Sequence, residues 1–197
     1  MRARGKETRR AVLRAAERVF AERGYAGARM DDVAAEVGIR RASMVYYFRD
    51  KRSLYLALLD DLFGNLFRGY EAALAEGGSA KDRFLRCVDV WTSHVTERPG
   101  MLRILFWEIA RIRRATVEPL VAEIAPMFTA VAEVIETGQR EGTFRPVDPM
   151  RFMMTIAGAT AFLTLGMTVL AADTRQLGAE DLRTELHSLS RRLLMDD

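Results

Sequence analysis

The chain has 197 residues, of which 49% are hydrophobic, and its 30 Lys and Arg against 27 Asp and Glu give a net charge of +3. This length can bury a sizeable core, and five prolines with 14 glycines argue against disorder and against a turn-rich β-sandwich. A single cysteine excludes an internal disulfide and a cysteine-based zinc site, and it fits a reducing cytoplasm.

Positive charge is concentrated in the N-terminal part of the chain. The first 60 residues hold 14 Lys and Arg against 8 Asp and Glu, whereas the remaining residues hold 16 against 19. A basic head on a mildly acidic body favours a polyanionic partner for the head. A solvated basic face would give the same composition. The basic N-terminus is followed by no apolar signal segment, so we expect a cytoplasmic protein.

Helical periodicity begins near the N-terminus and predicts an all-α fold. Apolar spacing and capping residues predict helices over 8–23, 30–37, 41–48 and from 51 to the Gly-Gly-Ser turn at 77–79. The pattern then continues to the end of the chain, with no convincing strand. The later helices are expected over about 84–95, 102–109, from 116 to a loop at 140–149, 150–171 and 179–195. Pro126 should kink or break the third of these.

One segment, residues 153–172, contains no charged residue and meets the length of a membrane span. Its threonines and glycines make a weak span, because they are less apolar than the residues that favour the bilayer core. A helix covered on every side by protein has the same composition. We therefore expect an interface or core helix and no membrane partner.

Residues 30–48 have the spacing of a helix-turn-helix. Gly38 can adopt the left-handed conformation that a tight turn needs. In the second helix, Met44 and Phe48 are four residues apart and share the face that should be buried. Tyr46 falls on the opposite face and Tyr47 on a flank. These tyrosines are therefore expected to point outward, beside several cations.

Exposed phenols among cations on a short helix can be accepted by the major groove of DNA. The alternative is that both tyrosines pack under the fourth helix and the arginines are solvated. We favour DNA, and expect Tyr46→Ala and Lys51→Ala to weaken binding without changing the fold. The candidate DNA-binding residues are Arg29, Arg40, Arg41, Ser43, Tyr46, Tyr47 and Lys51.

Several motifs follow one another between residues 8 and 59. A Gly-Tyr pair comes after the first helix, and a Val-Ala…Val-Gly turn follows. An aromatic run then ends in Phe48, and Lys51 precedes a leucine-rich helix. In this order they resemble the N-terminal domain of the TetR family of transcriptional regulators. The rest of the chain matches that family only in outline, through length, helical content and a loop before a long apolar helix.

The resemblance implies two domains, a DNA-binding domain over 1–50 and a ligand-binding and dimerisation domain over 51–197. It also implies a homodimer that binds a palindromic operator, acts most simply as a repressor, and is released by a small apolar or amphipathic effector. The last two helices would form the dimer. By position, Lys51 would hold a phosphate, and Arg41, Ser43, Tyr46 and Tyr47 would face DNA.

Three positions depart from the family pattern. Val45 stands where relatives commonly have a DNA-facing tyrosine, and Tyr47 where a histidine is common. Arg29 replaces the usual Ser or Thr cap of the second helix, which gives up a cap worth about 1 kcal/mol in exchange for a phosphate contact. The operator sequence therefore does not follow from the resemblance.

Large apolar and aromatic side chains are spread over the body helices, and an effector cavity would be built from such groups. The same residues at helical spacing also describe an ordinary core. Glu97 and Glu108 are candidate acids of such a pocket. The alternative is that both lie on the protein surface, where most glutamates are found. The candidate ligand-binding residues are Trp91, His94, Phe106, Trp107, Met127, Phe128 and Phe162.

An enzyme is the rival from another class. The sequence holds no phosphate-binding loop, dinucleotide fingerprint, zinc-protease motif or nucleophile elbow. Its two histidines and one cysteine give poor support to a catalytic triad or metal centre, so we expect no enzyme, no cofactor and no metal. A third reading is an architectural or division-linked DNA-binding protein without an inducer.

Overall fold

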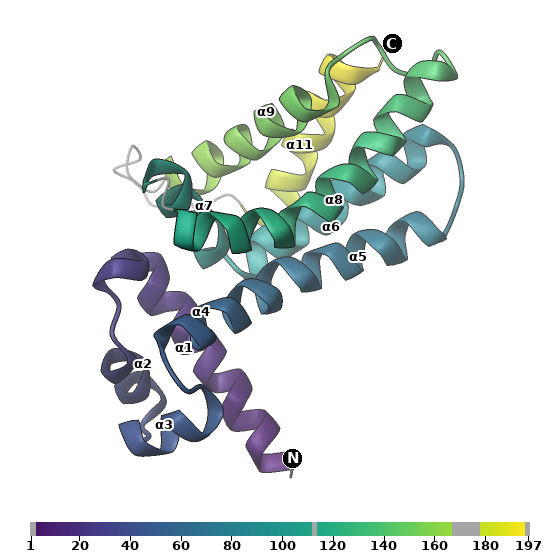
Figure 1. Ribbon diagram of the computed structural model, residues 1–197. Coiled ribbons are helices and arrows are strands. Elements are labelled where there is room, and N and C mark those ends of the chain that lie inside the picture. The colour runs from purple at the N-terminus through teal and green to yellow at the C-terminus, as the bar shows by residue number, and fades with distance from the viewer. Residues whose placement is uncertain (1–2, 112–113, 167–177, 196–197) are drawn as a thin grey trace. The chain divides into compact units, whose positions relative to one another are not determined.

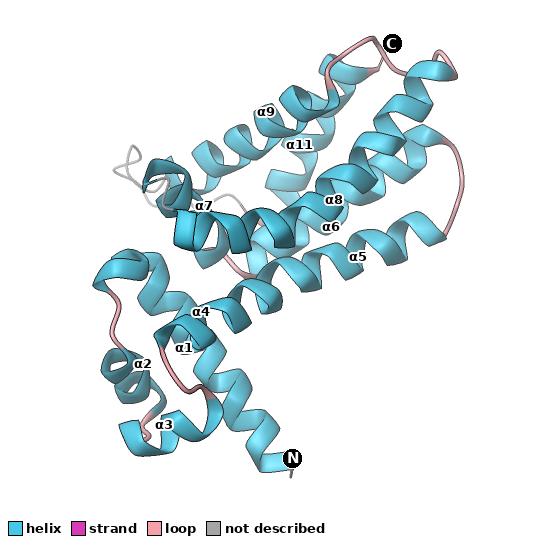
Figure 2. Cartoon of the chain, in the orientation of Figure 1, coloured by secondary structure: helices cyan, strands magenta, loops and turns pink. Residues whose placement is uncertain are grey.

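The computed structural model describes residues 3–111, 114–166 and 178–195, and the described chain is helical (Figures 1 and 2). It is 86% helical. One isolated antiparallel bridge joins Phe144 and Met195, with no strand elsewhere in the described residues. The predicted all-α fold, with an N-terminal helix-turn-helix and a larger C-terminal helical part, is confirmed.

The chain divides into two compact units that each use two separate stretches of sequence. Unit 1 comprises Met1–Asn65 and Gly100–Glu123, and unit 2 comprises Leu66–Pro99 and Ile124–Asp197. Unit 1 therefore extends beyond residue 50 and takes in a helix from the middle of the chain. Its elements are α1 (Ala3–Gly27), α2 (Met30–Val37), α3 (Arg41–Tyr47), α4 (Lys51–Leu59), the π-helical segment η1 (Asp60–Gly64), α7 (Gly100–Arg111) and the start of α8 (Arg114–Arg140).

Helix α1 forms the centre of unit 1. Its buried stripe includes Val12, Ala15 and Ala16, none of which is accessible to solvent, and it packs against α2, α4 and α7. The regular helix breaks at Gly24, whose φ of 64° and ψ of 173° suit glycine alone. An added Cβ at Gly24 would also lie 3.3 Å from the Trp107 ring.

Helix α7 is tied to both α1 and α4. The indole N–H of Trp107 donates to the Ala21 carbonyl at 3.1 Å. The buried Tyr55 hydroxyl donates to the buried Glu108 carboxylate at 2.7 Å, and burial, followed by this bond, raises the pKa of Tyr55 well above its usual value. We call the place where Gly24, Tyr55, Trp107 and Glu108 meet the α1–α4–α7 junction.

Unit 2 has its own aromatic core. The Phe84 ring lies against Phe144 and Phe152 at centroid distances of 5.9 and 5.7 Å, and the Trp91 N–H donates to Thr160 Oγ1 at 3.0 Å. Its elements are α5 (Asn65–Ala75), α6 (Ala80–Glu97), the larger part of α8, α9 (Pro149–Ala161), the π-helical segment η2 (Phe162–Gly166) and α11 (Ala179–Leu194).

Two expectations about helices need correction. Pro126 does not break α8, which runs from Arg114 to Arg140. Pro126 and Ala122 are both exposed, so the carbonyl that loses its N–H partner can bind water instead. The run that starts at Lys51 is interrupted by η1, where the helix widens for one turn before α5.

The apolar segment expected over 150–171 is described only as far as residue 166, and the remainder lies outside the described residues. Within those residues, no helix combines the length and the hydropathy that a bilayer span requires.

Candidate nucleic-acid interface

A tight turn sets the angle between α2 and α3. Gly38 adopts the left-handed conformation at φ 71° and ψ 28°, and its N–H donates to Ala35 O at 3.1 Å. The N–H of Ile39 donates to Ala34 O at 3.0 Å. These paired bonds are those of a Schellman motif, which ends a helix at a fixed geometry. The turn that the sequence predicted at Gly38 is confirmed.

Helix α3 presents the faces that the sequence predicted. Met44 is inaccessible and Phe48 only 4% exposed, whereas Tyr46 is 79% exposed. Tyr47 is half-buried on the flank, with its ring edge-on to that of Tyr46 at 5.3 Å. Val45, at 50% exposed, adds an apolar group that a thymine methyl could contact. Tyr46 therefore does not pack under the fourth helix.

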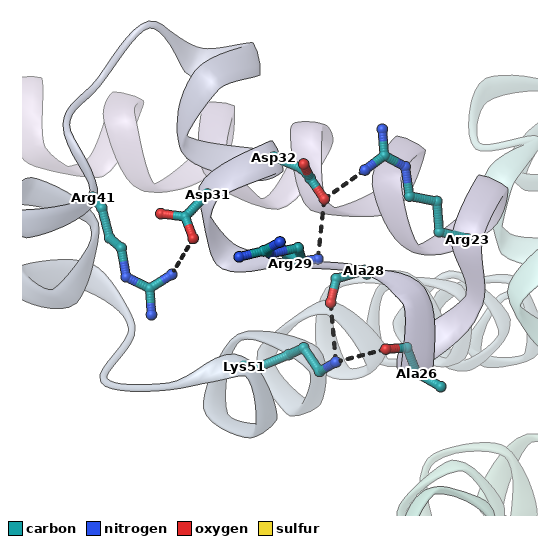
Figure 3. A network of polar contacts seen from close by, with 8 residues as sticks. All are labelled: Arg23, Ala26, Ala28, Arg29, Asp31, Asp32, Arg41 and Lys51. Carbon is teal, nitrogen blue, oxygen red and sulfur yellow. Dashed lines mark hydrogen bonds and ion pairs between the residues drawn. The ribbon is translucent and has the colours of Figure 1, made fainter.

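Four acidic groups in or near α2 and α3 each pair with an arginine, and Figure 3 shows two of these pairs. Asp31 pairs with Arg41 across the turn, and Asp32 pairs with Arg23 of α1. All four pairs are at least partly exposed, so each contributes little to stability. The four distances are 2.6 Å for Arg23–Asp32, 2.8 Å for Arg41–Asp31, 2.9 Å for Arg18–Glu36 and 3.1 Å for Arg49–Asp50.

Arg29 and Arg40 are exposed and have no acidic partner among the described residues. Each occupies the N-cap position of a helix, Arg29 before α2 and Arg40 before α3. A guanidinium has no acceptor and cannot cap. At α2 the Asp32 carboxylate accepts from the Arg29 backbone N–H at 3.2 Å instead. Both guanidinium groups are thus available to a polyanion.

Two other candidates lie beside these cations. Ser43 is exposed on α3. Lys51, at the start of α4, donates from Nζ to Ala26 O at 3.2 Å and to Ala28 O at 3.0 Å (Figure 3). Its Nζ also lies 4.8 Å from the centre of the Tyr25 ring. An ammonium has three protons, so one remains for the predicted phosphate contact. Lys51 also holds α1 to α4, which the sequence did not predict.

The first turn of α4 is held by Asp50. Its carboxylate accepts from the Ser53 N–H at 2.7 Å, and the Asp50 N–H donates to Ser53 Oγ at 3.1 Å. The backbone bond from Ser53, and then the neighbouring Arg49, lower the pKa of Asp50 below its usual value. Asp50 is therefore the N-cap of α4, and it fixes the backbone that carries Lys51.

The structure does not bring all seven ligand candidates into one unit. Phe106 and Trp107 lie on α7 in unit 1, and Trp107 is already packed on α1. Glu108, a candidate pocket acid, is instead buried against Tyr55. The other five, Trp91, His94, Met127, Phe128 and Phe162, belong to unit 2.

These five candidates differ in exposure. Trp91 and Met127 are each 8% exposed, His94 and Phe128 are half-buried, and Phe162 is 61% exposed. The Trp91 N–H is taken by Thr160, so this tryptophan has only its ring to offer a ligand.

The sequence matches two families of known proteins. Residues 12–58, which include α2 and α3, match the family described as bacterial regulatory proteins, tetR family. Residues 81–191 match the tetracyclin repressor-like C-terminal domain. The second match alone covers more than half of the chain.

Two curated relatives are transcriptional regulators. A transcriptional repressor of Streptomyces coelicolor is 26% identical over 95% of both chains. The transcriptional activator FasR of Mycolicibacterium smegmatis is 31% identical over 51% of this chain and 46% of its own. One relative represses and the other activates, so they do not decide the sign of regulation.

Solved structures share the fold. The regulator KstR2 of Mycobacterium tuberculosis superposes with a TM-score of 0.75 at 18% identity, covering all of this chain and 97% of the other. A transcriptional regulator of Saccharomonospora viridis, solved in complex with choline, superposes with a TM-score of 0.72 at 23% identity, covering 98% of this chain and all of the other.

Proposed function

Because the chain belongs to the tetR family of bacterial regulatory proteins, we propose that it binds a palindromic operator as a homodimer and releases it when a small molecule binds the C-terminal part. The family makes the chain a transcriptional regulator and not an enzyme. Repression, rather than activation, is the simpler form of this proposal, since effector binding then frees the promoter.

The observation that carries operator binding is the outward display of Tyr46. Its 79% exposure follows from the burial of Met44 on the opposite side of α3, and the exposed cations Arg41 and Arg49 lie within five residues of it in the sequence. A major groove accepts one short helix of this kind, and cations on both sides neutralise phosphates. We propose that the operator is contacted by Arg29, Arg40, Arg41, Ser43, Tyr46, Tyr47 and Lys51.

An exposed apolar stripe that runs along α9 to the first residue of η2 supports the homodimer. Met150, Met154 and Phe162 are 52%, 50% and 61% exposed, and they are spaced at multiples of four residues. Gly158 lies within this series and would meet no atom with an added Cβ. On α11, Leu193 is 40% exposed. We propose that these last two helices pair with the same helices of a second copy, as an isologous interface requires.

The effector proposal rests on the C-terminal family match and on apolar groups in unit 2. We place a small apolar or amphipathic molecule beside Trp91, His94, Met127, Phe128 and Phe162. The choline in the Saccharomonospora regulator supports a compact organic effector, because an aromatic ring such as that of Trp91 can bind a quaternary ammonium through its face.

Selection of bound fragments from genomic DNA, followed by footprinting, tests the proposal. We expect a palindromic site whose half-sites are about 34 Å apart, one helical turn, and a protein that sediments as a dimer. Met154→Arg should give a monomer with weakened operator binding, whereas Arg151→Met, a change at an exposed position of the same helix outside the stripe, should leave the dimer intact.

A monomer, or a set of many degenerate sites without a palindrome, would contradict operator recognition and favour the architectural alternative. A separate experiment addresses the effector: extraction of the purified dimer and mass analysis of the extract should identify the bound small molecule. Addition of the effector should weaken binding to the operator.

A further inference from the structure

The Arg41–Asp31 pair lies where the proposed DNA surface begins (Figure 3). Arg41 is the first residue of α3, and its guanidinium is 2.8 Å from the Asp31 carboxylate on α2. Their side chains are 57% and 51% exposed. An exposed pair of this kind forms and breaks at little cost, so a phosphate that arrives at Arg41 competes directly with Asp31.

We propose that Asp31 is a specificity-determining residue that withholds Arg41 from DNA until a duplex offers an acceptor in the correct place. This inference rests on the proposed operator binding. A carboxylate and a phosphate oxygen bind a guanidinium in the same way. Asp31 therefore acts as an internal substitute for the phosphate.

The neighbouring contacts make Asp31 the suitable residue for this role. Asp32, the next carboxylate, bonds the Arg29 backbone N–H and Arg23, so it supports the start of α2 and the packing of α1. Among the described residues, Asp31 bonds Arg41 alone. Its negative charge is thus not needed to cap a helix, and its loss should leave the turn unchanged.

Counterion exchange gives the proposal a distinct signature. A cation that neutralises one phosphate releases condensed counterions and adds about 0.9 to the slope of log affinity against log salt. On the operator, Arg41 leaves Asp31 for a phosphate and makes this contribution, whereas on other duplexes Asp31 retains Arg41. In the native protein, the Arg41 contact therefore contributes to the slope on the operator but not on a mixed-sequence duplex.

The test compares Asp31→Asn with the native dimer by fluorescence anisotropy over a series of salt concentrations. The probes are the operator duplex obtained by genomic selection and a mixed-sequence duplex of equal length. In the variant, Arg41 is free before binding, so the slope should steepen by about one on the mixed-sequence duplex and stay the same on the operator. Affinity for the mixed-sequence duplex at low salt should rise about threefold, and more than affinity for the operator.

Glu36→Gln is the matched control. It frees Arg18, which pairs with Glu36 at 2.9 Å and is exposed like Arg41, but Arg18 lies on α1 and outside the proposed contact set. This variant should keep the native slope. On the mixed-sequence duplex, Arg41→Ala/Asp31→Asn should also return the slope to the native value, because the freed cation is missing. Thermal unfolding of each variant separates a folding defect from a change in binding.

The outcomes distinguish the two proposals. A native protein that fails to select any palindromic site overturns operator recognition itself. A native protein that binds its operator, while Asp31→Asn and Glu36→Gln shift the slope equally or not at all, overturns only the role of Asp31. A steeper slope that persists in the double variant would also overturn it, because the effect would then come from net charge and not from Arg41.

Discussion

The exposed side of α3 and the α1–α4–α7 junction belong to the same unit but use tyrosine in opposite ways. On α3, Tyr46 is 79% exposed. In the junction, Tyr55 is 2% exposed and its hydroxyl is satisfied by the Glu108 carboxylate. The first ring contributes little to stability and is available to a partner outside the chain. The second ring is buried inside the protein, where a hydroxyl or carboxylate without a hydrogen-bond partner would lower the stability of the fold.

This difference predicts that substitutions in the two regions of unit 1 have different effects. A change in the junction should alter the free energy of unfolding, and a change on α3 should alter DNA binding at constant stability. Residues that connect the two regions should do some of both. The following substitutions test how completely this separation holds, from the largest expected effect to the smallest.

Tyr55→Phe should lower the free energy of unfolding by about 2 kcal/mol, because it leaves the buried Glu108 carboxylate without its recorded donor. Urea unfolding followed by circular dichroism measures the change. Tyr70→Phe is the matched control. Tyr70 is also buried, but its hydroxyl has no hydrogen bond within the described part of the chain, so its loss should be nearly neutral. Equal losses in the two variants would show that the Glu108 contact is unimportant.

Tyr46→Ala should weaken operator binding about tenfold, equivalent to about 1.4 kcal/mol, because it removes the most exposed group on α3. Its free energy of unfolding should stay within about 0.5 kcal/mol of the native value. Tyr46→Phe keeps the ring and reports on the hydroxyl alone. Anisotropy and urea unfolding of the same samples give both numbers. A stability loss as large as that of Tyr55→Phe would end the contrast between the two regions.

Lys51→Met should affect both properties. The sequence predicted that loss of Lys51 leaves the fold unchanged, but Nζ donates to two carbonyls near the end of α1, so the free energy of unfolding should fall by about 1 kcal/mol. The salt slope of operator binding should also fall by about one.

Arg52→Met is the matched control for Lys51, because it removes the adjacent exposed cation of α4, for which the described chain holds no partner. It should leave stability unchanged. If Lys51→Met lowers stability but not the slope, Lys51 is a structural residue and leaves the proposed contact set.

Asp50→Asn should change mainly the acid sensitivity of unfolding. The folded pKa of Asp50 lies below its usual 3.8, chiefly through the Ser53 N–H. The ionised cap therefore stabilises the fold above that value, and this contribution disappears as the pH falls through the lowered pKa. The drop in unfolding temperature between neutral pH and about pH 3 should be smaller in the variant. Glu22→Gln, at an exposed position on α1, controls for net charge.

The sequence predicted the parts of this interface that depend on neighbours along the chain. The turn at Gly38 is closed by bonds that run three and five residues back along the chain, and the outward face of α3 follows from the four-residue spacing of Met44 and Phe48. Helical periodicity encodes such contacts directly. The helix from Met30 to Val37 was predicted with the bounds that the structure has.

The junction could not be predicted in this way, because its contacts join distant positions. Tyr55 and Glu108 are 53 residues apart, and Trp107 bonds a carbonyl 86 residues away. A tryptophan and a glutamate at helical spacing fit a cavity wall or a core equally well. Only the packing of α7 on α1 distinguishes the two, and no local pattern in the sequence records it.

The place of α7 in unit 1 bears on how regulators of this type can be recombined. A chimera that exchanges only the first 50 residues would set a foreign α1 and the host α7 together. The Trp107 ring would then have to fit against whatever residue the foreign α1 has in the place of Gly24, although the host Tyr55 and Glu108 would remain paired. The transferable cassette is therefore discontinuous. It consists of the N-terminal helices together with α7, and chimeras that exchange both segments should keep α3 in its native position.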